Sequence, residues 1–179
     1  MGDFLYNITE WLRSTWLADF ALGMSEWPLT QWVVVHFWAI PIMQIIHILA
    51  IAGSFSAVLM LNMRIFGFAG HATLAETSRR YTKVLWWSLL FVIASGVAML
   101  FGDTVRNLLN AIFWIKMILV VTAVVSSLAF TKSLSRRTAG ANGVQGEVVG
   151  GGTKAAAFFL VILWIAIIFC GRWIAYAPA

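Results

Sequence analysis

The sequence predicts an all-α integral membrane protein in which four transmembrane helices form a bundle. Of its 179 residues, 61% are hydrophobic and 11% are charged, and the mean hydropathy is +0.89. Soluble domains contain about 45–50% apolar and about 25% charged residues, so the composition excludes a soluble fold. The length is that of one membrane domain, residues 1–179.

Four segments are apolar over the roughly 20 residues that a helix needs to cross a bilayer. They cover residues 31–63, 82–101, 108–130 and 155–176. The first is longer than the hydrocarbon core is thick, and Pro41 predicts a kink in it because the proline ring crowds the carbonyl of Phe37. The glycine-rich segment 131–154 predicts a flexible loop between the third and fourth helices.

The segment 3–22 has a different character. Aromatic and aliphatic residues alternate in it with Glu10, Arg13 and Asp19, which makes it too polar to span a membrane. The pattern predicts an N-terminal amphipathic helix that lies in the membrane interface, with its tryptophans at the depth of the lipid headgroups. A helix packed on a partner subunit is the alternative.

The distribution of charge predicts the topology. Segments 64–83 and 131–154 together carry eight Lys or Arg residues and two Glu residues, whereas the N-terminal segment, the turn around Asp103 and the C-terminus carry three Arg and five acids. Basic loops stay in the cytoplasm, so we expect both termini outside, in the periplasm, and the protein in the bacterial inner membrane. This bias also explains the basic pI of about 9.9 without nucleic acid. The expected partners are the lipid bilayer and other chains, in a homo-oligomer or a larger membrane complex.

Ionisable side chains at membrane depth are costly and usually functional. Four such residues are candidates for a functional site. His36 and His47 lie in the first helix, Lys116 lies in the third, and Arg172 lies near the outer end of the last helix. Small residues share a helix face with His47, which predicts that this face packs against another helix in the bundle interior. His36 returns to nearly the same face but lies about 16 Å away along the helix, so the two histidines cannot bind one iron atom.

A neutral imidazole is a good ligand for haem iron and for copper. We therefore interpret His47 as a metal ligand, the axial ligand of haem b, and Lys116 as a second ligand or a contact of a haem propionate. Arg172 is a candidate charge partner for a propionate, and His36 is a further cofactor-binding candidate. The alternatives are structural: a histidine hydrogen-bonded to a neighbouring helix, a lysine that extends to the interface, and an arginine that anchors the helix end.

Over nearly its whole length the chain resembles an uncharacterised family of four-helix bacterial inner-membrane proteins with an N-terminal amphipathic segment. The runs that carry the resemblance are PIMQIIHILAIAGSFSAVLMLNMRIFG, SRRYTKVLWWSLLFVIASGVAMLF, FWIKMILVV and WIAIIFCGRWIAY. The GRWIAY-type ending is the most specific of them. Members often carry an acid where this chain has Gln44, which puts an acid–histidine pair in doubt here, and His36 lies outside the family pattern.

The order of a histidine in the first helix, arginines before the second and a lysine in the third is also distantly similar to the membrane four-helix protoporphyrinogen oxidases and to copper-resistance D-type proteins. The likeness to the oxidases implies that haem b is bound through His47 and that Lys116 is needed.

Three functions follow as expectations. The first is a haem b-binding membrane protein that transfers electrons or oxidises a porphyrin-like or quinone-like substrate; whether it is an enzyme stays open. The second is a cofactor-free structural subunit or homo-oligomeric assembly. The third is transport of copper or another metal, for which His36, Met43, His47 and Cys170 are the available ligands.

Overall fold

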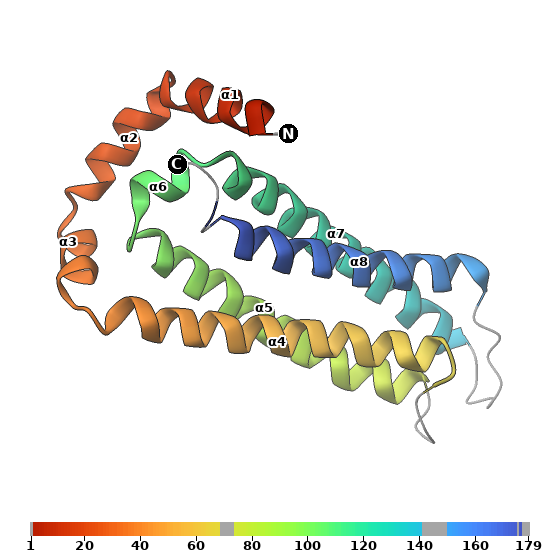
Figure 1. Ribbon diagram of the computed structural model, residues 1–179. Helices are drawn as coiled ribbons and strands as arrows, with labels where there is room; N and C mark the ends of the chain where they lie inside the picture. The colour runs from red at the N-terminus through yellow and green to blue at the C-terminus, as the bar shows by residue number, and fades with distance from the viewer. Residues whose placement is uncertain (1, 69–73, 141–149, 175, 177–179) are drawn as a thin grey trace.

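The computed structural model describes residues 2–68, 74–140, 150–174 and 176, and within 2–3 and 135–140 it describes the backbone alone. The described residues are folded into helices joined by short turns (Figure 1). In chain order these are α1 (Gly2–Arg13), α2 (Trp16–Ser25), α3 (Pro28–Val35), α4 (Ala39–Ile65), α5 (Leu74–Leu100), α6 (Thr104–Leu108), α7 (Ala111–Gly140) and α8 (Gly151–Trp173).

Four of the helices are long and apolar enough to cross a membrane: α4, α5, the Ala111–Leu134 part of α7, and α8. Only 17–28% of the residues in their apolar stretches are buried inside the protein. The remaining apolar side chains face outward, where lipid rather than water is the solvent that suits them. The predicted class, a helical protein with four membrane-spanning candidates, is confirmed.

The bundle consists of two antiparallel helix pairs, α4 with α5 and α7 with α8 (Figure 1). The pairs are joined by contacts of α8 with α4 and of α5 with α7. One buried apolar cluster lies between all four helices and includes Leu61 of α4, Leu89 of α5, Phe130 of α7 and Trp164 of α8. This cluster lies in the half of the bundle where α4 ends, and it leaves the other half for the polar residues described below.

The short helices α1, α2, α3 and α6 gather at the other end of the bundle, called the capped end from here on (Figure 1). Leu12 and Leu17 pack on Leu109, and Ala21 and Met24 pack on Leu108, so α1 and α2 rest on the connection between α5 and α7. Much of the outer surface of this end is aromatic: the side chains of Trp11, Trp16, Trp27, Trp32 and Trp38 are exposed. Exposed tryptophans of this kind are typical of a membrane interface.

The sequence predicts one kinked helix over 31–63, whereas the structure has two helices, α3 and α4, separated at residues 36–38. Pro41 is the third residue of α4, where the backbone nitrogen has no intrahelical partner to lose. A helix that continued upstream would bring the proline ring against the carbonyl of Phe37. The clash at Pro41 is the one predicted from the sequence, but it results in a break between two helices and not in a kink within one helix.

The segment 3–22 is also divided, into α1 and α2, at residues 14–15. The hydroxyl of Ser14 donates to the carbonyl of Trp11 at 2.8 Å and that of Thr15 to the carbonyl of Leu12 at 2.6 Å. Such side-chain bonds satisfy carbonyls at a helix end, and this chemistry favours termination over continuation.

The predicted loop 131–154 is helical at both ends, because α7 continues to Gly140 and α8 begins at Gly151. The flexibility predicted for its central part falls on residues 141–149, which lie outside the described residues.

The end of α4 is set by Gly67, whose φ of 85° is accessible to glycine without strain. Its nitrogen donates to the Arg64 carbonyl at 3.1 Å and the Phe68 nitrogen to the Met63 carbonyl at 2.9 Å, the pattern of a Schellman motif.

Candidate functional site

The side chain of His47 lies inside the bundle, where α4 packs against α5. It is 9% exposed, and Ala50, Ser54 and Ala57, which share its helix face, are buried as well. This confirms the prediction that the small-residue face of the first spanning helix points inward. His47 is the ninth residue of α4, which places it about 12 Å from the capped end of that helix.

The imidazole is held by a hydrogen bond to Ser95 of α5. The distance between His47 Nδ1 and Ser95 Oγ is 2.8 Å, and the Ser95 hydroxyl in turn donates to the backbone carbonyl of Phe91. A hydroxyl has a single proton, so with that proton on the Phe91 carbonyl the Ser95 oxygen accepts, and His47 Nδ1 donates. The neutral ring then carries its free lone pair on Nε2.

Glycine at position 96 allows α5 to approach the imidazole. A Cβ atom at Gly96 would lie 3.4 Å from His47 Cε1, which is the lower limit of an ordinary van der Waals contact. A similar close approach occurs one and a half turns further along α4, where a Cβ at Gly53 would lie 2.7 Å from the hydroxyl of Ser88. The small residues of both helices therefore let α4 and α5 pack closely around the histidine.

Lys116 approaches the same part of the bundle from α7. Its Nζ atom would lie 3.7 Å from a Cβ placed on Gly171 of α8, and it lies close enough to His47 for an electrostatic interaction. Within the described part of the chain no carboxylate forms an ion pair with this amine. An ammonium group at this depth calls for an anionic or electron-rich partner.

The structure therefore brings His47 and Lys116 into the same part of the bundle, whereas His36 and Arg172 lie elsewhere. His36 is at the break between α3 and α4, where its Nδ1 is 2.7 Å from the carbonyl of Trp32 and its ring stacks on the Trp32 ring at 4.5 Å. Because the helix is broken there, the common face predicted for His36 and His47 does not exist. The guanidinium of Arg172 is exposed and donates to the hydroxyl of Tyr176 at 3.0 Å, one turn away.

The sequence analysis did not identify Ser95 as a partner of His47. The sequence does mark Ser95 as unusual, since it is a hydroxyl residue followed by glycine within an apolar run. Its pairing with His47, 48 residues earlier in the chain, depends on the register between α4 and α5. The approach of Lys116 to Cys170 and Gly171 likewise depends on the register between α7 and α8.

No group of three or more His, Cys, Asp or Glu side chains with metal-binding geometry lies within the described residues. The candidate site therefore consists of His47 and Lys116.

The fold and this site define a class: a helical protein with four membrane-spanning candidates, a buried histidine and a half-buried lysine between its helices. Comparisons with protein-family models, with curated proteins and with solved structures gave no match for this chain.

Proposed function

We propose that this protein binds haem b within its helix bundle and serves in electron transfer or in the oxidation of a porphyrin-like or quinone-like substrate. The observation that carries the proposal is the hydrogen bond between His47 Nδ1 and Ser95 Oγ at 2.8 Å, on a ring that interacts electrostatically with Lys116. With the Ser95 proton on the Phe91 carbonyl, this bond leaves Nε2 as the lone-pair donor of the ring. Haem-ligating histidines commonly bind iron through one nitrogen and give the other nitrogen's proton to an acceptor, which fixes the ring.

The residues present fit such a group in three ways. His47 would ligate the iron, Ser95 would hold the imidazole and its tautomer, and Lys116 would neutralise a propionate or serve as a second ligand. Bound haem would supply one-electron chemistry at its iron. The contribution of the chain is to orient the imidazole, to provide a positive charge and to exclude water.

The topology belongs to the same proposal. The capped end, with its exposed tryptophans and α1–α3, would face the periplasm, and the basic ends of α4, α5 and α7 would face the cytoplasm of a bacterium. In this orientation His47 and Lys116 would lie in the periplasmic half of the membrane, and Arg172, next to Gly171, would lie at its edge as a candidate charge partner for a propionate.

The test is the absorption spectrum of the protein purified in detergent, with and without added haemin. The wild type is expected to give a Soret band, His47→Ala to lose it, and His36→Ala, which removes the other described histidine, to keep it. Lys116→Met is expected to shift the band or weaken haem binding. A wild type without a Soret band, or an undiminished band in His47→Ala, would refute the proposal.

A second function is favoured by a specific observation. The bond between His47 and Ser95 already pairs the imidazole across α4 and α5, so the histidine could serve as a helix contact in a cofactor-free subunit or homo-oligomer. In that case Lys116 would find its partner in another chain. Native mass spectrometry decides between the two, because this function predicts a defined assembly with no bound cofactor. Metal analysis of the same sample tests the third function, transport of copper or another metal.

A further inference from the structure

Gln44 of α4 is a polar residue on the exposed surface of a membrane-spanning candidate. It lies six residues after Trp38, about 9 Å further along the helix. Trp38 is one of the exposed tryptophans of the capped end that mark the membrane interface, so Gln44 lies deeper, at the level of the hydrocarbon. Its amide has no hydrogen-bond partner among the described residues. Because lipid tails offer none either, Gln44 needs a partner beyond these residues.

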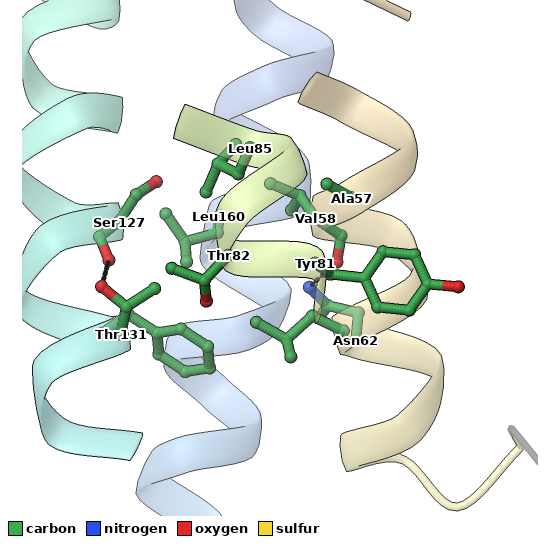
Figure 2. A pocket seen from close by; sticks show the side chains of 11 residues that line it. Ala57, Val58, Asn62, Tyr81, Thr82, Leu85, Ser127, Thr131 and Leu160 are labelled. Atoms are coloured by element: carbon green, nitrogen blue, oxygen red, sulfur yellow. Dashed lines mark hydrogen bonds between the residues drawn. The ribbon is translucent and has the colours of Figure 1, made fainter. Parts of the chain in front are cut away.

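Two other polar residues of the spanning helices show what Gln44 lacks. Asn62, the second amide of α4, is 5% exposed, and its Nδ2 donates to the Val58 carbonyl at 2.9 Å. Figure 2 shows it inside the bundle, among side chains of the other long helices. Thr122 of α7 is exposed, as Gln44 is, but its hydroxyl donates to the Ile118 carbonyl of its own helix at 2.8 Å. Gln44 has neither the burial of Asn62 nor the bond of Thr122.

Gln44 is the first residue of an exposed ridge along α4, called the Gln44 ridge. Ile48 and Ala52 follow at intervals of four residues, so the three side chains lie along one side of the helix. All three are exposed, Ile48 to 63%. The described helices therefore leave the ridge uncovered, and the small side chain of Ala52 lets a helix from outside the chain approach closely.

The chemistry of the amide and the symmetry of a membrane favour a second copy of this chain as the partner. Two copies inserted in the same orientation form a closed pair about a two-fold axis perpendicular to the membrane, so a residue at the axis meets its counterpart at equal depth. An amide carries donors and an acceptor, so two glutamines can exchange two hydrogen bonds. A charged side chain at this position would instead repel its own copy.

We propose that the Gln44 ridge is the interface of a homodimer in which the two Gln44 side chains form hydrogen bonds to each other across the two-fold axis. Ile48 and Ala52 pack against the same ridge of the second copy. His47 is buried and bonded to Ser95 within its own chain, so it takes no part in the interface. The dimer therefore depends neither on haem binding nor on Lys116.

Native mass spectrometry of the full-length protein, with dilution in micelles, tests the dimer. The wild type is expected to be dimeric, and Gln44→Leu is expected to raise the dissociation constant about 3- to 30-fold, the range for hydrogen bonds between membrane helices. Gln44→Asn keeps the donors and the acceptor on a shorter side chain, so its loss is expected to be smaller. Thr122→Val is the matched control: it removes an exposed hydroxyl bonded within its own helix, so the constant is expected to stay unchanged.

Oxidative cross-linking locates the interface. In a Cys170→Ala background, Ile48→Cys is expected to form a disulfide-linked dimer with a lipid-soluble oxidant, and adding Gln44→Leu is expected to slow its formation. Val121→Cys, at a residue of α7 that is 59% exposed, is expected to remain unlinked. A monomeric wild type, a dissociation constant unaffected by Gln44→Leu, or equal cross-linking at positions 48 and 121 would overturn the proposal. A different protein that co-purifies with the wild type and is lost from Gln44→Leu would overturn it as well.

Discussion

Replacement of Ser95 by alanine tests the hydrogen bond on which the candidate site depends. Ser95→Ala removes the acceptor that lies 2.8 Å from His47 Nδ1, and it leaves the imidazole of a residue that is only 9% exposed with the backbone of Val92 as its remaining hydrogen-bond partner. The methyl group that remains fits the same space, so the change leaves helix packing intact. We expect the variant to fold but to be less stable.

The magnitude follows from two opposing effects. A buried donor that loses its acceptor costs about 1–3 kcal/mol in a protein interior. Side-chain hydrogen bonds between membrane helices couple more weakly, by about 0.6 kcal/mol on average and at most about 1.7 kcal/mol, because the unfolded helices in the membrane also find partners. We therefore expect Ser95→Ala to lose about 1 kcal/mol of the free energy of unfolding, with most of this loss absent in a His47→Leu background.

The assay is reversible unfolding of the purified protein in mixed micelles, followed by circular dichroism. Ser54→Ala is the matched control: Ser54 is 0% exposed on the neighbouring helix, and its hydroxyl lacks a partner among the described residues, so its removal is expected to cost nothing. If Ser95→Ala were no more destabilising than Ser54→Ala, or if its cost were the same with and without His47, the assigned hydrogen bond and the tautomer derived from it would be wrong.

Two further predictions concern packing and topology. Gly53→Ala would put a Cβ 2.7 Å from the Ser88 hydroxyl, which has to rotate away, so it is expected to gain less helix stability than Gly23→Ala. Gly23→Ala meets nothing within 4 Å and is expected to gain about 0.5–1 kcal/mol. Equal effects in the unfolding assay would contradict this. In a cysteine-free background, a membrane-impermeant thiol reagent is expected to label Asp103→Cys in cells whose inner membrane is intact, but Ala75→Cys only after that membrane has been opened. The reverse labelling pattern would invert the proposed orientation.

The sequence was sufficient to predict the class of protein, because hydropathy over a 20-residue stretch is a local property and lipid directly solvates the apolar side chains that produce it. It was also sufficient for the inward direction of His47, since the small residues Ala50, Ser54 and Ala57 recur on its helix face and are buried. Both results depend on composition and helical periodicity alone.

The helix ends and the pairing of side chains needed more than periodicity. The break at residues 36–38 arises from a clash that the sequence reveals, but whether a helix kinks or stops depends on what the preceding segment packs against, here the capped end. The contact of His47 with Ser95 and that of Lys116 with Gly171 depend on the register between helices, which no property of one helix determines.

The capped end has a mechanical consequence for the bilayer around the protein. The helices α1, α2, α3 and α6 add their cross-section to one end of a four-helix body, so among the described residues that end is the broader one. A body that is wider in one leaflet acts as a wedge, spreading the lipids of that leaflet further apart than those of the other. The strain is smallest where the membrane already bulges on the wide side, so the protein is expected to collect at such bends.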